Sequence, residues 1–365
     1  MTQFVPSPAR PAPLSEGGLV AWLRKNLFSS IPNSIVSLIA IWFAFKAVTS
    51  IFGWAIWNAD WVGTSRDDCT SGGACWVFVA TRLQTFLYGF YPADELWRPN
   101  TVFLTLVALV VWMNIPKAPF KKWVVIGTLT VYPVVSFILL YGNSFGLPQV
   151  QTSSWGGLTL TLVIAVVGVV LALPIGIVLA LGRRSDMPIV RFVSTIFIEF
   201  WRGVPLITVL FMASVMLPLF FSGGTSIDRL LRALIGITLF QAAYIAEVVR
   251  GGLQAIPKGQ YEAADALGLS YWQKTNLIVL PQALKITIPS LVGTLISLFK
   301  DTTLVLIIGL QDVLAMVRQG LADPAWLGFP AEGYAFAGLM FWIFCFGMSR
   351  YSLYLERRLN TGHKN

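Results

Sequence analysis

The residues best suited to chemistry in this sequence are polar and ionisable side chains that interrupt long apolar stretches. They are Glu199, Arg202, Gln241, Tyr244, Lys300 and Asp301. Charged groups inside a membrane span are costly, and they usually face a partner or a water-filled path. Together these six residues are candidates for lining a path through which a polar solute crosses the membrane.

Two of the candidate pairs also have a purely structural interpretation. Glu199 and Arg202 are three residues apart on one predicted helix, so they share a face and can pair. Counted from Arg191 at about 1.5 Å per residue, they lie about 12 and 16 Å into the span, close to the middle of the bilayer. Lys300 and Asp301 are the second charged pair. Either pair can bind a solute or hold adjacent helices together.

Several kinds of catalytic site are excluded by residue type. The only histidine is His363, in the polar tail, which excludes haem ligation by paired histidines, histidine-based zinc sites and Ser-His triads. The three cysteines do not form a metal-binding set. The chain also lacks the G-x-x-x-x-G-K-[ST] loop that cradles phosphates. We therefore expect no catalytic residue, metal or other cofactor in this chain, and its driving energy must come from a partner or an ion gradient.

Composition predicts the elements that position these residues. The chain is 56% hydrophobic and 12% charged, which is about half the charge of a soluble domain. Apolar stretches of about 20 residues recur, enough to cross a bilayer. The sequence therefore predicts an all-α membrane protein with about eight spans: Ser34 to Trp57, Thr101 to Ile115, Trp123 to Tyr141, Leu158 to Leu181, Phe192 to Phe221, Leu230 to Val249, Ile286 to Leu310 and Tyr334 to Tyr354.

The apolar stretch from Trp76 to Tyr91 leaves two alternatives open. Arg82 and Gln84 interrupt it, and its aromatic residues suit a helix that lies in the membrane interface. If this stretch instead spans the bilayer, the topology of everything before it changes.

The placement of charge predicts the orientation of the chain. Most of the 26 lysines and arginines fall on the same side of the predicted spans as the two termini. Because such residues gather in cytoplasmic loops, we expect both termini in the cytoplasm, and the net charge of +9 needs no nucleic acid to explain it. Cys69 and Cys75 then fall in an external loop, where they are either disulfide-bonded or two free thiols.

The cytoplasmic loop at 251–284 carries the clearest motif. Helix-forming residues predict a first short helix over about Gln260 to Leu267, which ends where Gly268 can adopt a left-handed conformation. Ser270 and Gln273 can then form a capping box at the start of a second helix, which we expect Pro281 to end. The product is a compact knob suited to docking in a groove on another protein, although an ordinary ordered loop would leave the same pattern.

The residues of this loop resemble a known motif. Glu262-Ala263-Ala264, followed by Gly268 and Ile278-x-Leu280-Pro281, resembles the EAA motif of ABC importer permeases in every fixed position. The flanking segments around Glu199, Tyr244 and Lys300 resemble the polar amino-acid branch, such as the histidine, glutamine and general L-amino-acid permeases. The resemblance covers about Trp155 to Arg358. The three preceding spans resemble the M-type membrane subunit of general L-amino-acid importers.

This resemblance implies an architecture for the chain. It comprises a cytoplasmic tail (1–33), an extension of three spans with a periplasmic loop (34–151), a five-helix permease core (155–358) and a short cytoplasmic tail (359–365). In the bacterial inner membrane, the EAA loop would dock on the ATPase through Glu262, Ala263, Ala264, Gly268 and Leu269.

The resemblance also implies partners and a substrate class. The partners would be a cytoplasmic ATPase dimer that holds the ATP and magnesium, a second and shorter permease, a periplasmic amino-acid-binding protein and membrane lipid, with no nucleic acid. The chain would be a transporter subunit rather than an enzyme, carrying polar or general L-amino acids. A zwitterionic amino acid needs a cation for its carboxylate and an anion for its amine, which the charged pairs above can supply.

Three other functions compete with this interpretation. An ion-gradient-driven secondary transporter is the main alternative, although the two halves of the sequence show no internal repeat of the kind common in that class. A membrane enzyme would lack a usable histidine, metal cluster or nucleotide loop. A non-transporting scaffold would leave the charges within the spans unexplained.

Overall fold

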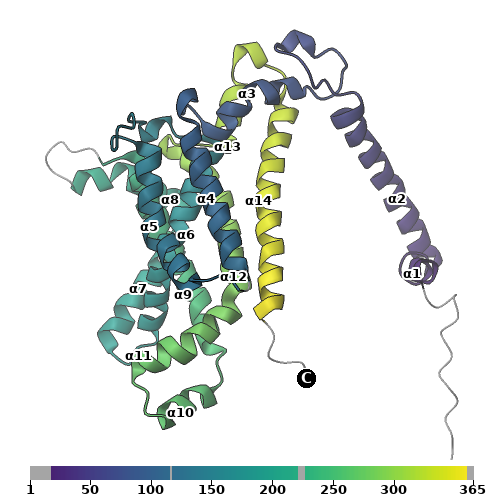
Figure 1. The fold of residues 1–365 in the computed structure, drawn as a ribbon. Coiled ribbons are helices and arrows are strands. Elements are labelled where there is room, and N and C mark those ends of the chain that lie inside the picture. Colours follow the sequence, from purple (N-terminus) through teal and green to yellow (C-terminus); the bar gives the residue numbers. More distant parts are fainter. Residues whose placement is uncertain (1–17, 116, 221–226, 360–365) are drawn as a thin grey trace, which may run out of the picture. The chain divides into compact units, whose positions relative to one another are not determined.

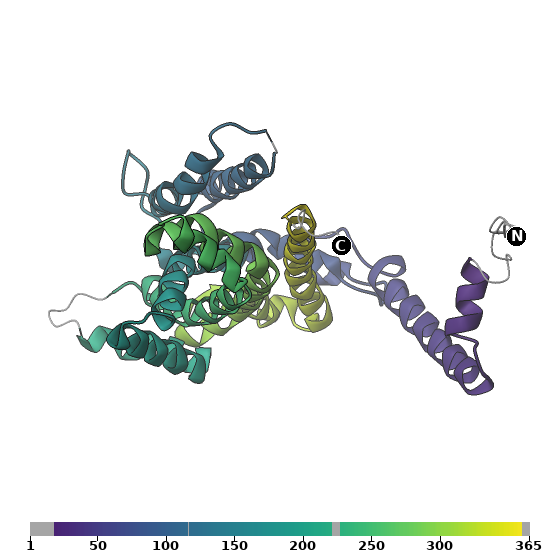
Figure 2. The same cartoon turned by 90° about the horizontal axis from the view of Figure 1, so that it is seen from below.

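The computed structural model describes residues 18–115, 117–220 and 227–359. Regular structure in these residues is helical apart from the two-residue strand β1 (Gln311–Asp312). The chain divides into two units, Met1–Val77 and Phe78–Asn365. Figures 1 and 2 show the helices from two directions.

Unit Met1–Val77 contains the first predicted span. Its elements are α1 (Leu19–Asn26), α2 (Ile31–Phe52), the π-helix η1 (Gly53–Trp57) and the 3-10 helix η2 (Arg66–Asp68). Ser30 begins α2 by accepting the backbone N–H of Asn33 at 3.4 Å, which satisfies one of the free donors of the first turn. Residues 31–57 are long and apolar enough to cross a membrane. Their large apolar side chains are exposed, as expected for a helix surrounded by lipid.

A cross-linked loop follows this span. Cys69 and Cys75 are joined by a disulfide, with their Cα atoms 5.6 Å apart. The Asp68 carboxylate accepts the backbone N–H groups of Thr64 at 2.8 Å and Ser65 at 2.9 Å. These two bonds stabilise the ionised carboxylate and hold the pKa of Asp68 below its ordinary value. The loop is therefore held by both covalent and local polar contacts.

Unit Phe78–Asn365 holds the remaining helices. They are α3 (Trp76–Tyr88), which begins at the boundary, η3 (Ala93–Glu95), α4 (Trp97–Asn114), α5 (Lys121–Tyr141), η4 (Thr152–Ser154), α6 (Gly157–Arg183), α7 (Pro188–Gly203), α8 (Leu206–Val215), η5 (Leu217–Phe220), α9 (Arg229–Gln254), α10 (Lys258–Ala266), α11 (Tyr271–Lys274), η6 (Thr275–Val279), α12 (Leu280–Asp301), η7 (Thr302–Ile308), α13 (Val313–Leu321), η8 (Pro324–Trp326) and α14 (Pro330–Leu359).

The prediction of an all-α protein with about eight spans is confirmed. Within the described residues, seven helices are long and apolar enough to cross a membrane. The pair α7 and α8 passes the same test together, but the two helices meet at a bend of 101°. The predicted fifth span is therefore either a broken span or a re-entrant segment. Its last predicted residue, Phe221, lies outside the described residues.

The length of helix α3 argues against the alternative in which its stretch spans the bilayer. It has 13 residues, fewer than the roughly 20 that a spanning helix needs. Phe78 and Phe86 on this helix are fully buried, and the Phe78 ring lies 5.7 Å from that of Trp326. These two aromatic side chains therefore pack inside the protein, whereas Phe90 is exposed.

The core of the larger unit forms where α6 packs against α9. Small residues line this contact: Ala172 on α6 and Ala242 on α9 are fully buried. A Cβ added to Gly176 would lie 2.6 Å from Cγ2 of Ile245, so only glycine permits this close approach. Small residues commonly let helices approach in membranes, where apolar burial gives no driving force between them. The pair forms a rigid frame on which the functional elements are mounted.

The predicted division between residues 34–151 and 155–358 does not coincide with the boundary between the two units. Helices α4 and α5 pack together and belong to the larger unit (Figure 1). Leu140 and Val150 share one buried cluster with Leu160 and Ile164 of α6. The second and third spans are thus packed with the core rather than separate from it.

Candidate coupling loop and charged cluster

The loop at 251–284 lies at one end of the larger unit, with α10 furthest from the spans (Figure 1). Gly268 ends α10 with φ +70°, in the left-handed region. No atom lies within 4 Å of the position a Cβ would take there, so backbone conformation and not space favours glycine. Ser270 then donates its N–H to Oε1 of Gln273 at 2.9 Å in a capping box. The predicted helix, glycine turn and capped second helix are confirmed.

Most of the residues predicted to dock on a partner are accessible. Glu262, Ala263 and Gly268 are exposed and Leu269 is half-buried. Ala264 is fully buried, which contradicts its predicted place on the docking surface. Its methyl group faces inward because the helix places neighbouring residues about 100° apart. Ala264 therefore supports the knob from inside.

Leu267 adds an apolar side chain to the exposed face of the knob, with 75% of its surface accessible. Large apolar groups isolated on a polar loop are frequent contact points for a partner. We call the exposed residues Glu262, Ala263, Leu267 and Gly268 the docking face.

Polar contacts fix the knob to the spans. The Tyr261 hydroxyl donates to the Leu253 carbonyl at the end of α9, at 3.2 Å. Lys274 and Asp265 join the two short helices by an ion pair of 2.6 Å. The knob is thus held to α9 and can transmit a displacement to it.

The second helix of the loop continues into the next span, contrary to the prediction that Pro281 would end it. Residues 271–308 form one continuous helical segment. The π-helical turn η6 ends two residues before Pro281 and closes with the Leu280 N–H on the Thr275 carbonyl. A wider turn of this kind re-routes the hydrogen bonds that a proline ring disturbs. The knob is therefore attached directly to α12.

Five charged side chains from three helices meet near the base of this loop. The Glu247 carboxylate pairs with Arg183 at 2.6 Å, with Arg250 at 2.8 Å and with Arg202 at 3.5 Å. Arg183 also pairs with Glu199 at 2.7 Å. We call these five residues the charged cluster. It joins α6, α7 and α9.

The predicted pair between Glu199 and Arg202 is wrong. Each binds a residue on another helix instead, namely Arg183 and Glu247. Each charged side chain can pair either with a neighbour on its own helix face or with a group on an adjacent helix. Here the ion pairs between helices form. The side chain of Glu247 is only 16% exposed, so its pairing with three arginines compensates for its loss of water.

The structure places Glu199 beside the end of α6, and its depth in the bilayer stays a prediction. Arg183 is the last residue of α6, and Glu199 contacts it although Glu199 is the twelfth residue of α7. In an antiparallel hairpin, Glu199 would lie beside a residue about three turns before the end of α6. Helix α7 therefore crosses the end of α6, and the charged cluster lies at the end of the spans that carries the loop.

Gln241 and Tyr244 have different environments. Gln241 is buried and donates from Nε2 to the Thr294 carbonyl of α12 at 3.2 Å. Tyr244 is 38% exposed, and the guanidinium of Arg202 lies 5.8 Å from its ring centroid. Tyr244 thus adjoins the charged cluster, whereas Gln241 joins two helices.

Lys300 and Asp301 lie together at the end of α12. Lys300 is exposed and Asp301 half-buried. Neither forms an ion pair with any residue in the described ranges, so the structural pairing considered for them is not formed. They remain candidates for contact with a solute.

Sequence reasoning missed the part that Arg183, Glu247 and Arg250 play in the cluster. The i, i+3 spacing of Glu247 and Arg250 is a usable signal, because residues at this spacing share a helix face. No local pattern, however, connects Arg183 with Glu247 across 64 residues. That contact depends on the packing of α6 against α9.

Comparison with known proteins gives concordant results. The family described as "Binding-protein-dependent transport system inner membrane component" matches residues 172–361. The chain is 57% identical to an inner membrane amino-acid ABC transporter permease protein, YhdY, of Escherichia coli (strain K12), over 97% of both chains. It is 40% identical to the glutamate/glutamine/aspartate/asparagine transport system permease protein BztC of Rhodobacter capsulatus, again over 97% of both chains.

A shorter relative matches only part of the sequence. The glutamate/aspartate import permease protein GltK of Escherichia coli O157:H7 is 34% identical over 55% of this chain and 91% of its own length. Together with the family match and the two full-length similarities, this shows that the chain belongs to the binding-protein-dependent inner membrane transport components, as an amino-acid ABC transporter permease.

Proposed function

We propose that this permease forms the translocation path of an ATP-driven importer for polar L-amino acids and receives force from its ATPase through the loop at 251–284. The accessible docking face on a knob fixed to α9 and α12 carries this proposal. The names of the relatives support the substrate class, since two of them transport glutamate and aspartate. The charged cluster gives the force a route into the bent pair α7 and α8.

The family name implies a binding protein, and the similarity to ABC transporter permeases implies a separate ATPase. We infer that a second, shorter permease completes the path. The shorter relative, which lacks a counterpart to nearly half of this chain, supports this inference. In such a pair, residues 34–151 would be an extension carried by one partner only.

The route of the amino acid is proposed from the charges that remain available. Four of the five cluster residues are engaged with Glu247 or are Glu247 itself, so they serve coupling better than binding. Lys300 and Asp301 offer a cation and an anion without ion-pair partners among the described residues, which suits a carboxylate and an ammonium group. Tyr244 and Arg202 would lie where the path meets the cluster.

The orientation is proposed from charge. With both termini in the cytoplasm, the knob faces the ATPase and the disulfide-bonded loop faces the oxidising side of the inner membrane. Arg24 and Lys25 before the first span, and Arg357 and Arg358 in the last turn of α14, fit this assignment.

A reconstitution experiment tests the proposal. Proteoliposomes would contain the permease, the second permease and the ATPase. The binding protein and radiolabelled glutamate would be added to the side of the membrane opposite to the ATPase. Uptake is expected with ATP and is expected to stop when the ATPase carries a substitution of its catalytic carboxylate. Uptake driven by an ion gradient in vesicles that contain this chain alone would overturn the proposal in favour of a secondary transporter.

A further inference from the structure

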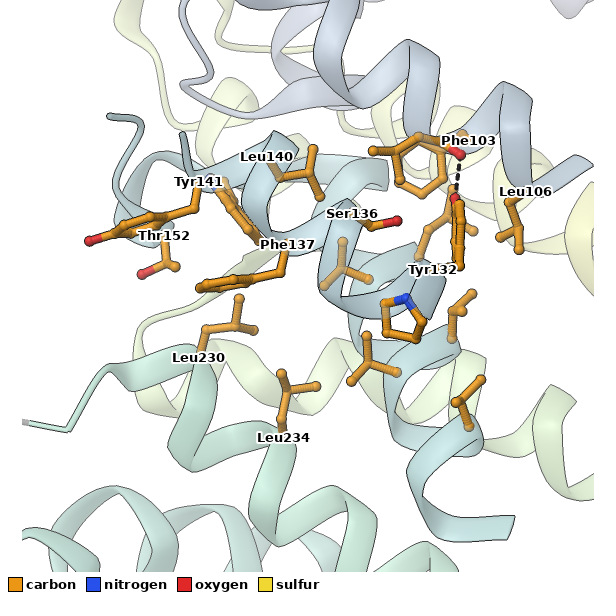
Figure 3. A pocket seen from close by; sticks show the side chains of 18 of the residues that line it. Phe103, Leu106, Tyr132, Ser136, Phe137, Leu140, Tyr141, Thr152, Leu230 and Leu234 are labelled. Carbon is orange, nitrogen blue, oxygen red and sulfur yellow. Dashed lines mark hydrogen bonds between the residues drawn. The ribbon is translucent and has the colours of Figure 1, made fainter. Parts of the chain in front are cut away.

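Two cavities adjoin at the end of α9 that lies opposite to the coupling loop. The first, of about 360 Å³, lies between α4 and α5 on one side and α6 and α9 on the other (Figure 3). Its walls are largely apolar and include Phe103, Phe137, Val167 and Leu234. A cavity of this size is within the range that binds small organic molecules.

The second cavity has a different character. It has a volume of about 490 Å³ and includes the side chains of Arg229 and Arg232. It shares Tyr141, Thr152, Trp155 and Asp228 with the first cavity. An apolar chamber therefore adjoins a basic one, which is the shape of a site for a molecule with an apolar tail and an anionic head.

Two buried polar groups that line the cavities have no hydrogen-bond partner among the described residues. Trp155 is 2% exposed, and its indole Nε1 has no hydrogen-bond partner among the described residues. The same holds for the buried hydroxyl of Ser136, which lines the apolar cavity (Figure 3). A buried donor without a partner costs about 1–3 kcal/mol. A ligand that accepts a hydrogen bond at this level would remove that cost.

The charges of the second chamber favour an anion. Neither Arg229 nor Arg232 forms an ion pair within the described parts of the chain; Arg229 donates to the Gly309 carbonyl at 3.2 Å and Arg232 to the Ser214 carbonyl. Asp228 is the acidic residue of this chamber, and its carboxylate is engaged by the Leu231 N–H at 3.1 Å and by the Thr152 hydroxyl. The first turn of α9 adds the positive end of its dipole.

The dimensions match one leaflet of a bilayer. The residues of α6 that line the apolar cavity extend from Leu162 to Val170, which is about 12 Å along the helix. Half of the hydrocarbon core of a bilayer is about 15 Å thick. An acyl chain in this cavity would have its headgroup at the level of the two arginines.

We propose that the two cavities together bind one phospholipid with an anionic headgroup, its acyl chain between α5 and α6 and its phosphate at Arg229 and Arg232. The lipid belongs to the leaflet opposite to the coupling loop. It fills the space between the second and third spans and the α6–α9 frame, and so secures these helices to the core. The proposal does not depend on which amino acid is transported.

Native mass spectrometry of the full-length permease tests this site. The protein, purified in mild detergent and stripped of lipid, is mixed with equal amounts of phosphatidylglycerol and phosphatidylethanolamine. The wild type is expected to retain phosphatidylglycerol preferentially. The double variant R229Q/R232Q is expected to lower this preference by about tenfold, because two cations near a headgroup are removed. The charge-matched control R66Q/R318Q changes two arginines outside both cavities and is expected to retain the preference.

Two further experiments distinguish a lipid headgroup from free phosphate, and the contribution of the apolar chamber from that of the arginines. Inorganic phosphate at 10 mM should not displace the lipid, because it cannot occupy the apolar chamber. Val167→Trp fills that chamber and should reduce lipid retention while both arginines remain. If the double variant is not monodisperse, Arg229→Gln alone, at an exposed position, should give a smaller loss in the same direction.

Three results would overturn the proposal. The first is equal retention of the two lipids by the wild type, and the second is an unchanged preference in R229Q/R232Q. The third is displacement by inorganic phosphate, which would identify a site for a free anion. Retention of neither lipid by the wild-type protein would overturn the proposal as well, because the cavities would then hold no lipid.

Discussion

Substitution of Gly268 by alanine isolates the turn of the coupling loop from every other feature of the permease. The turn has φ +70°, and a Cβ there would meet no atom within 4 Å. The cost is therefore conformational, and for a residue with a Cβ in the left-handed region it is about 1–2 kcal/mol. That free energy lowers the population of the native turn relative to alternatives by a factor of about 5–30. The spans do not share this strain, so the chain should still fold and insert.

Two matched variants make the interpretation specific. Gly259→Ala adds the same methyl group to the same loop, but Gly259 lies within α10 in a helical conformation with open space around it. Alanine should be tolerated there, since it favours a helix over glycine by about 1 kcal/mol. Gly268→Asn should recover part of the lost function, because asparagine adopts the left-handed conformation more readily than alanine.

The assay is ATP-driven amino-acid uptake by the reconstituted importer, normalised to the amount of permease in the membrane. Gly268→Ala should lower uptake several-fold at unchanged permease content, Gly259→Ala should leave it near the wild-type rate, and Gly268→Asn should lie between them. Equal uptake by Gly268→Ala and the wild type, or equal losses in both alanine variants, would refute the idea that the turn conformation is what the partner requires.

Three other predictions follow from the cluster, the disulfide and the orientation. Glu247→Gln should destabilise the permease by about 1–3 kcal/mol, because three partly exposed arginines lose their shared partner, and should lower its thermal midpoint where Glu356→Gln does not; equal midpoints would refute a stabilising cluster. Reduction of the Cys69–Cys75 disulfide, whose loop entropy is worth about 2 kcal/mol, should speed tryptic cleavage at Arg66, and an unchanged rate would count against this. In intact spheroplasts with Cys345→Ser, an impermeant maleimide should label Phe145→Cys and not Leu267→Cys, and the reverse pattern would invert the topology.

Rules that depend only on neighbouring residues are sufficient to predict the helices and the turn of the coupling loop. The left-handed Gly268 and the capping box of Ser270 with Gln273 depend on residues within a few positions of one another, so the sequence predicts them directly. The length of each apolar stretch is likewise sufficient to predict most of the spans, because the thickness of the bilayer is nearly fixed.

The wrong pairing of Glu199 with Arg202 has a different cause, namely contacts between helices far apart in the sequence. Glu199 and Arg202 satisfy the spacing rule for a pair, but Arg183 and Glu247 compete for them once α6, α7 and α9 pack together. The fifth predicted span is also not one straight helix, because α7 meets α8 at 101°. Pro281 was expected to end a helix because the preceding π-helical turn has no simple sequence signal.

Site-specific photo-crosslinking tests the central claim, that the loop at 251–284 is the contact with the ATPase. A photoreactive amino acid would replace Leu267 on the docking face or Phe145 in the loop between α5 and α6, both of them highly exposed. After illumination of inner membranes that contain the whole importer, the account predicts an adduct with the ATPase from position 267 and none from position 145. An ATPase adduct from position 145, with none from position 267, would contradict it.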